Sequence, residues 1–240
     1  ITSISSYTFS KCSSLTRVNI PLSIISIGEN AFYWCSSLIR IEIPPSVASI
    51  EESAFYECWS LKEVIIHSKL KSIGTNCFSG CSSLKSILIP SSVVSIGDTA
   101  FYGCSSLTKI EIPSSVKKIG TCVFQKCLSL REIIIHSSLT SINDGTFLSC
   151  SSLEEIAVPP TITSIESNAF FCCSSLKTFK VPSSVHLIGS GSFSNCSGLV
   201  EVFIPTSVKT ICSHAFSYCK SLVQVHIHSI AEQINLPRAN

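Results

Sequence analysis

The sequence predicts an α/β-type repeat solenoid, in which short parallel strands alternate with short helical or 3₁₀ turns. The first observation is a repeat: isoleucine recurs at one unvarying interval, from Ile4 and Ile27 onward to Ile234. Phenylalanine, cysteine and leucine recur at the same interval, and no insertion or deletion interrupts them. The second observation is that a helix-like and a strand-like apolar spacing alternate inside each unit.

Both spacings are visible in any one unit. Phe32, Cys35 and Leu38 are three positions apart, which predicts a helical or 3₁₀ turn with one face inward. Ile41 and Ile43 alternate with polar residues, which predicts a short strand buried on one side. A proline follows and ends the strand, because it has no N–H for a ladder.

A single unit of this length cannot bury its apolar side chains alone. Stacking places each strand beside its copy in the next unit, at the ~4.8 Å spacing of a parallel sheet. The neighbours then share one continuous core. We therefore expect residues 1–240 to form a single solenoid domain of about ten 23-residue units.

The complete unit reads Ala-Phe-x-x-Cys-x-Ser-Leu-x-x-Ile-x-Ile-Pro-x-Ser-Val-x-x-Ile-Gly. It resembles the 23-residue leucine-rich repeat of the BspA-like proteins, over residues 1–234. The resemblance implies a right-handed leucine-rich-repeat stack. It also implies a surface-exposed adhesin of the bacterial and protozoan kind, which binds extracellular-matrix or host proteins. Ordinary leucine-rich repeats carry asparagine after the strand; Pro-x-Ser or His-Ser stands here, so we expect no asparagine ladder.

Strand positions that point away from the core differ from unit to unit, whereas the core columns barely change. A solenoid uses such a sheet face as its extended binding surface. The residues expected to bind a protein partner are Arg17, Arg40, Glu42, Glu63, Ile65, Leu88, Lys109, Glu111, Glu132, Ile134, Lys180 and Phe203.

A second interpretation of these residues is structural. Arg40–Glu63 and Lys109–Glu132 would be lateral ion pairs between adjacent strands, and we favour this reading for the charged residues. For the apolar residues we favour a contact surface. Its expected clusters are Ile65 beside Leu88, Ile134 beside Ala157, and Phe203 beside Val200 and Val223.

Ten of the fourteen cysteines form one repeat column, from Cys12 to Cys219. Stacked copies have near-parallel Cβ vectors, which suit a disulfide poorly, so we expect buried free thiols. Cys77 stands in an alanine column and should be buried as well. Cys122, Cys172 and Cys212 are expected to be exposed. So many reduced thiols favour a reducing setting, in tension with a surface adhesin.

The sequence indicates no catalytic, metal or cofactor site. Asp98 and Asp144 are the only aspartates, and no Ser-His-acid set, Walker loop or nucleophile elbow is present. His67 and His136 lie three units apart, about 14 Å by strand spacing, which is too far for one metal. We read them, with His228, as substitutes for the proline after the strand.

The net charge of +2 and the pI of about 8.0 give no strong attraction to nucleic acid. No apolar run reaches the ~18 residues of a membrane helix, so we expect no membrane insertion in this segment. The leading expectation is a cell-surface or secreted adhesin. The alternative is a cytoplasmic protein-interaction scaffold, and a weaker third is a glycan-recognition module, for which the strand face supplies one aromatic residue, Phe203.

Both ends of the sequence also suggest expectations. The chain lacks methionine and begins within a unit, so it should be a fragment of a longer chain or array. The first unit has no polar cap, which predicts possible homo-association through the N-terminal end. After Ile227 the columns are lost at 229–233 and 235–238, which we interpret as a partial cap.

Overall fold

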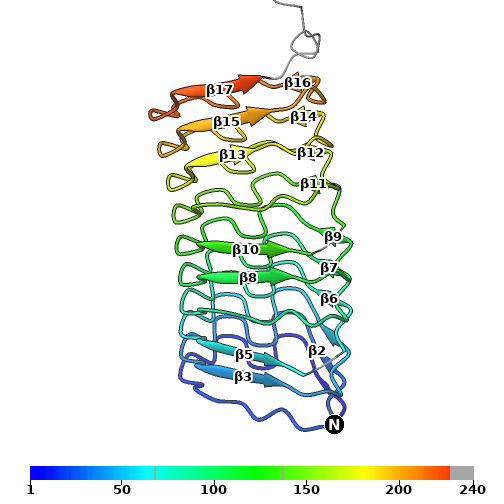
Figure 1. The fold of residues 1–240 in the computed structure, drawn as a ribbon. Coiled ribbons are helices and arrows are strands. Elements are labelled where there is room, and N and C mark those ends of the chain that lie inside the picture. Colours follow the sequence, from blue (N-terminus) through cyan, green and yellow to red (C-terminus); the bar gives the residue numbers. More distant parts are fainter. Residues whose placement is uncertain (68, 137, 228–240) are drawn as a thin grey trace, which may run out of the picture.

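The protein, described by a computed structural model over residues 1–67, 69–136 and 138–227, is a stack of ten units (Figure 1). The long strands run from left to right across the front, and each unit lies above the one before it. The path is therefore a right-handed superhelix, as expected. The interpretation of residues 229–238 as a cap lies outside the described residues.

The front of the stack carries the longer strands, and strands of successive units pair in parallel with equivalent residues opposite each other, as in Arg40↔Glu63. Their side chains alternate between core and solvent, for example in the burial of Ile41 and Ile43 but not Glu42. The strands are β3 (Arg40–Ile43), β5 (Glu63–Ile66), β8 (Lys109–Ile112), β10 (Glu132–Ile135), β13 (Thr178–Lys180), β15 (Glu201–Ile204) and β17 (Gln224–Ile227).

A second row of two-residue strands forms the right-hand side of Figure 1. Each contains one of the isoleucines of the repeat, and pairs in parallel with the equivalent strand of an adjacent unit, as in Ile4↔Ile27. The strands are β1 (Ser3–Ile4), β2 (Ser26–Ile27), β4 (Ser49–Ile50), β6 (Ser72–Ile73), β7 (Ser95–Ile96), β9 (Lys118–Ile119), β11 (Ser141–Ile142), β12 (Ser164–Ile165), β14 (Leu187–Ile188) and β16 (Thr210–Ile211).

The front ladder is interrupted twice, at residues 86–89 and 155–158, which are not strands. Each interruption comes directly after a strand that is followed by histidine in place of proline, β5 before His67 and β10 before His136. The last residues of these two strands, Ile66 and Ile135, are half-buried, whereas Ile43 of β3 is fully buried. The front sheet is thus divided into blocks: β3–β5, β8–β10 and β13–β15–β17.

The segment between the two rows contains turns and no helix within the described residues, so the predicted helical or 3₁₀ conformation is wrong. Two residues per unit, such as Asn30 and Trp34, have positive φ. The N–H groups of Phe32 and Trp34 donate to the carbonyls of Ala54 and Tyr56 in the next unit, each at 2.8 Å. A 3₁₀ helix would use these donors internally, whereas here they join neighbouring units.

The phenylalanine column forms the centre of the core. Adjacent rings stack with centroids 5.1–5.8 Å apart and planes within 18° of parallel, from Phe9 to Phe216. The rings from Phe32 to Phe193 are buried almost completely. Offset stacking of this kind adds to the stabilisation that burial of such large side chains provides.

The cysteine column packs beside these rings, and its residues from Cys35 to Cys196 are buried free thiols, as predicted. Each thiol also donates to the carbonyl of the phenylalanine 26 residues earlier, in the preceding unit, with Sγ–O distances of 3.0–3.3 Å from Cys35 to Cys219. This thiol ladder was not predicted. Cys12 is exposed, contrary to expectation, because only one unit packs against the first unit of the stack.

The four cysteines outside the column are free as well. Cys77 is buried, as predicted from its place in an alanine column. Cys122, Cys172 and Cys212 are half-buried, so they are less exposed than we expected.

Hydroxyl groups follow the front strands where ordinary leucine-rich repeats carry asparagine. Thr161 donates to the carbonyl of Leu139 at 2.7 Å, and Ser184 donates to that of Ile162 at 2.6 Å. These bonds again cross to the preceding unit. They take the place of an asparagine ladder at two positions of this column.

Burial makes the thiol column chemically inert. Loss of solvent around the sulfur raises the pKa of the Cys35 thiol to about 11 and that of Cys81 and Cys127 well above the usual value. Alkylation requires the thiolate, so a raised pKa lowers the reactive fraction at pH 8.

We therefore expect brief treatment of the native protein with iodoacetamide at pH 8 to spare the buried thiols. Mass spectrometry should find these unmodified until the chain is unfolded in guanidinium chloride: Cys35, Cys58, Cys77, Cys81, Cys104, Cys127, Cys150, Cys173 and Cys196. Cys12 should react, and it serves as the internal positive control. Equal labelling of Cys12 and Cys104 in the native state would contradict the burial of this column.

The positive-φ positions allow a second test. Gly103 has φ 67°, and a Cβ there would meet no atom closer than 3.8 Å, so only backbone strain opposes a side chain. Gly103→Ala should lower the free energy of unfolding by about 1 kcal/mol, the cost of the left-handed conformation. Urea denaturation measures the loss, with Ser106→Ala, at a residue of ordinary φ, as the control. Equal midpoints for the two variants would count against the strain.

Candidate functional site

The candidate site is the front face, which we define as the outward side chains of the long strands and of the segments 17–20, 86–89 and 155–158. The structure places all twelve predicted residues on it. Nine are exposed: Arg17, Arg40, Glu42, Glu63, Leu88, Lys109, Glu111, Glu132 and Lys180. Ile65, Ile134 and Phe203 are half-buried.

The interruptions of the ladder limit which of these residues are paired across adjacent strands. Strands β3 and β5 place Glu42 opposite Ile65, and β8 and β10 place Glu111 opposite Ile134. Leu88 is 77% exposed on an unpaired segment. No ladder joins Ile65 to Leu88, or Ile134 to Ala157, so the strand pairing that we expected in these two apolar clusters is absent.

The third apolar cluster lies at the C-terminal end of the face. Phe203 of β15 stacks on His226 of β17, with centroids 4.4 Å apart and planes 1° from parallel. The Nε2 atom of His226 lies 2.6 Å from Oε1 of Glu201. Val200 and Val223 are exposed and joined by a backbone hydrogen bond. Phe203 therefore has His226 as its stacking partner, and the two valines are adjacent to each other at the start of β15 and β17.

The predicted lateral ion pairs are present. Arg40 Nε lies 3.4 Å from Glu63 Oε2, and Lys109 Nζ lies 2.7 Å from Glu132 Oε1. These side chains are about half exposed, and Arg40 also contacts Glu42 at 3.4 Å. The charged residues thus neutralise one another while remaining accessible to solvent.

Histidine–glutamate pairs are a feature that the sequence reasoning missed. His67 lies 3.1 Å from Glu42 and His136 lies 2.9 Å from Glu111, across adjacent units. The sequence suggests these histidines only as replacements for proline. The sequence does contain a pattern that identifies them: in every pair the glutamate precedes the histidine by the same number of positions. Within the described residues no three metal-ligating groups come together.

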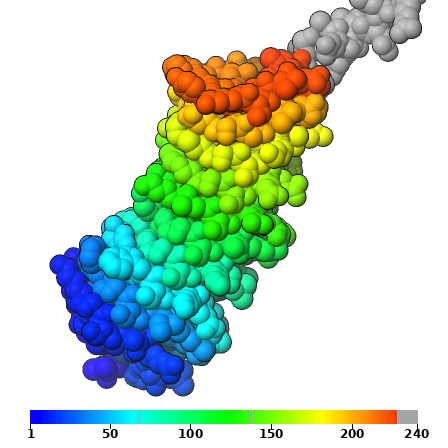
Figure 2. Space-filling view, turned by 90° about the vertical axis from the view of Figure 1, so that its left-hand side faces the viewer, coloured from blue at the N-terminus to red at the C-terminus, as the bar shows by residue number. Residues whose placement is uncertain are grey.

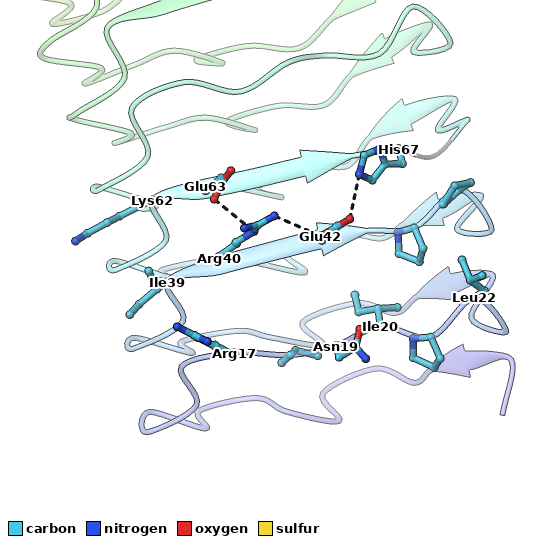
Figure 3. A pocket seen from close by; sticks show the side chains of 14 residues that line it. Arg17, Asn19, Ile20, Leu22, Ile39, Arg40, Glu42, Lys62, Glu63 and His67 are labelled. Atoms are coloured by element: carbon cyan, nitrogen blue, oxygen red, sulfur yellow. Dashed lines mark hydrogen bonds and ion pairs between the residues drawn. The ribbon is translucent and has the colours of Figure 1, made fainter.

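A hollow of about 910 Å³ opens at the N-terminal end of the front face (Figure 3). Dashed lines in the figure trace a chain of contacts from Glu63 through Arg40 and Glu42 to His67. Arg17 and Lys62 extend away from this chain. Neither forms a salt bridge with a carboxylate among the residues described.

Several residues of this hollow were not predicted from the sequence. Lys62 and Ile39 lie just before the strands, and Leu22 comes from the first unit, which bridges to β3 through Arg17↔Arg40. The alternation of strand residues predicts outward strand positions only, and these three residues lie in loops at the edges of the strands. The hollow combines cationic groups with apolar walls.

A second, smaller hollow of about 410 Å³ lies beside the interruption at 155–158. Its lining includes Ile135, His136, Ala157 and Pro159. This hollow lies where β10 has no paired strand in the next unit. In the described part of the chain, no helix is long and apolar enough to cross a membrane.

Solved structures show the same fold. A leucine-rich repeat protein of Eubacterium ventriosum matches with a TM-score of 0.65 at 23% identity, over 91% of this chain and 80% of that one. The pneumococcal vaccine antigen PcpA matches with a TM-score of 0.60 at 24% identity, over 85% and 60%. The leucine-rich repeat protein of T. pallidum is 35% identical over 59% of this chain and 69% of its own, with a TM-score of 0.56.

The search of curated proteins found no match. The family described as the BspA type leucine rich repeat region matches in six copies, over residues 2–131 and 119–236. These matches extend over nearly the whole stack, in agreement with its repeat columns. The chain belongs to the BspA-type leucine-rich-repeat family.

Proposed function

We propose that this chain is a non-catalytic protein-binding module whose front face contacts the partner. The observation that carries the proposal is the contrast between the two sides of each long strand. Inward residues repeat the same apolar types, whereas outward residues are exposed or half-buried and change from unit to unit. A rigid backbone that presents a varied surface is the usual binding device of solenoid proteins.

The hollow at the N-terminal end supports the same proposal. Arg17 and Lys62 offer cationic groups beside the apolar Ile39 and Leu22. Such a mixture of Arg with exposed apolar side chains is typical of the centres of protein interfaces. An acidic segment of a partner would neutralise these two cations.

We further propose that the chain acts as an adhesin at the cell surface and binds extracellular-matrix or host proteins. Support comes from its family, which the resemblance noted above associates with surface adhesion. A cytoplasmic scaffold of the same fold is the second candidate. The free cysteines favour the scaffold, because five of them are not fully buried: Cys12, Cys122, Cys172, Cys212 and Cys219.

Binding residues can be tested by mutation only where they contribute little to stability. Exposed ion pairs are screened by water and by salt. A double-mutant cycle of Lys109→Ala and Glu132→Ala should therefore give a coupling energy of about 0.2–1 kcal/mol in urea denaturation. A coupling of several kcal/mol would show that this pair maintains the fold, and the face could then not be altered independently of stability.

Binding itself is tested with a face variant, Arg17→Glu/Leu88→Glu/Lys180→Glu. All three side chains are exposed, so the variant should fold normally. On an immobilised panel of extracellular-matrix proteins, measured by biolayer interferometry, the native chain should bind at least one protein. The face variant should weaken that binding at least tenfold.

The matched control is Lys71→Glu/Val94→Glu/Lys209→Glu, on the side that carries the two-residue strands. It makes the same change in charge and also replaces one exposed apolar residue. Equal losses in both variants would show a non-specific charge effect and defeat the proposed face. Binding to cytosolic proteins with none to the matrix panel would favour the scaffold over the adhesin.

A further inference from the structure

The two tryptophans of the chain lie together, away from the front face. Trp34 and Trp59 belong to the loops that lead into the front strands, on the left-hand side of Figure 1. Figure 2 views the stack from this side. Tyr33 and Tyr56 lie in the same two units. We refer to Tyr33, Trp34, Tyr56 and Trp59 as the aromatic corner.

The four rings of the aromatic corner form a chain of contacts in the order Tyr56, Tyr33, Trp34 and Trp59. Tyr33 and Tyr56 stack at 5.1 Å with planes 7° apart, and Tyr33 lies 6.1 Å from Trp34. Trp34 and Trp59 meet edge to face, at 5.3 Å and 60°. The tryptophans are 40% and 42% exposed, although such large rings are usually well buried. The contacts fix the rings in place without covering them.

A carboxylate stands within this group. Glu57 occupies the column of Trp34 one unit later, and its Oε2 atom accepts a hydrogen bond from the indole N–H of Trp59. The side chain lies over Gly80, where a Cβ would come within 2.5–2.7 Å of the carboxyl group. The absence of a side chain at Gly80 leaves room for this carboxylate. Glu57 therefore adds a fixed negative charge beside the rings.

The same columns hold a cation further along the stack. Tyr102 is the next tyrosine in the column of Tyr33 and Tyr56, and the ammonium of Lys126 lies 5.2 Å from its ring centroid. Lys126 stands in the column of Trp34. Within the described residues this is the one cation–π contact, so no lysine or arginine among them covers the rings of the aromatic corner in this way.

We propose that the aromatic corner and Glu57 form a second binding site, which takes a lysine or arginine side chain of a protein partner. The faces of indole and phenol rings attract cations, and a neighbouring carboxylate strengthens the attraction. An anionic group would be repelled by Glu57. The contact between Lys126 and Tyr102 shows that this edge of the stack accommodates a cation over a ring. This site is independent of the front face and goes beyond the function proposed above.

The experiment uses the fact that both fluorescent indoles of the chain belong to the site. The probes are three blocked peptides of one sequence that contain arginine, citrulline or glutamate at the same two positions. Citrulline keeps the shape of arginine without its charge. The arginine peptide should change the tryptophan emission in a saturable manner, and the citrulline and glutamate peptides should bind at least tenfold more weakly.

Three variants complete the test. Glu57→Gln retains both indoles and should weaken binding of the arginine peptide at least fivefold, while circular dichroism reports an unchanged fold. Trp34→Leu should weaken binding of the arginine peptide to a similar degree, and the emission of Trp59 measures this binding. The front-face variant Arg17→Glu/Leu88→Glu/Lys180→Glu should leave the affinity for the peptide unchanged, which separates this site from the proposed function.

Three outcomes would overturn the proposal. The citrulline peptide could bind as tightly as the arginine peptide, Glu57→Gln could have no effect, or none of the peptides could change the emission. Chitotriose serves as an additional probe. Saturable binding of chitotriose with none of the arginine peptide would identify the aromatic corner as a glycan site instead.

Discussion

The whole molecule depends on contacts between equivalent positions of successive units, because no unit satisfies its own backbone or buries its own core. Phe32 stacks on Phe9 and on Phe55 at 5.2 Å, and its N–H bonds to the carbonyl of Ala54. The thiol of Cys58 donates back to the carbonyl of Phe32. Each unit is therefore bound to both neighbours by rings, amides and thiols at once. Stability in such a stack is a property of neighbouring pairs.

This constraint explains why the repeat columns and the strand register are visible in the sequence. A side chain that must stack on its own copy has to recur without drift, so the columns from Phe9 to Phe216 are legible in the printed sequence. The strand register follows from the same interval. Since the register places Arg40 beside Glu63 and Lys109 beside Glu132, the lateral ion pairs were predictable as well.

Other features depend on geometry that periodicity does not encode. The regular spacing of Phe32, Cys35 and Leu38 suits a helix, but left-handed residues at Asn30 and Trp34 break it into turns. Most units have a residue other than glycine at these two positions, so the residue types do not predict the left-handed conformation. The interruptions of the front ladder and the aromatic corner each arise from a few units that differ from the rest. A consensus sequence of the repeat omits residues that occur in only a few units.

The sequence predicts which face of the stack carries the candidate site, but it does not predict the hollow on that face. Alternation along the strands placed all twelve residues on one face, as the structure shows. The hollow beside Arg17 also requires loop residues such as Leu22 and Lys62, which no strand pattern includes. The aromatic corner lies on a different side and uses positions that hold serine or glycine in several other units. Both proposed binding surfaces thus lie where units depart from the common pattern.

The unbroken interval has a consequence for the gene. Removal or duplication of the codons for one whole unit, starting at any point within the stack, would join equivalent backbone positions and keep every core column in register. Unequal recombination between units could therefore lengthen or shorten the protein without disrupting its core. Such an event between the hollow and the C-terminal Phe203 would change the distance between them and leave the chemistry of each intact. The length of the proposed binding surface would then change in evolution while the residues at its two ends stay the same.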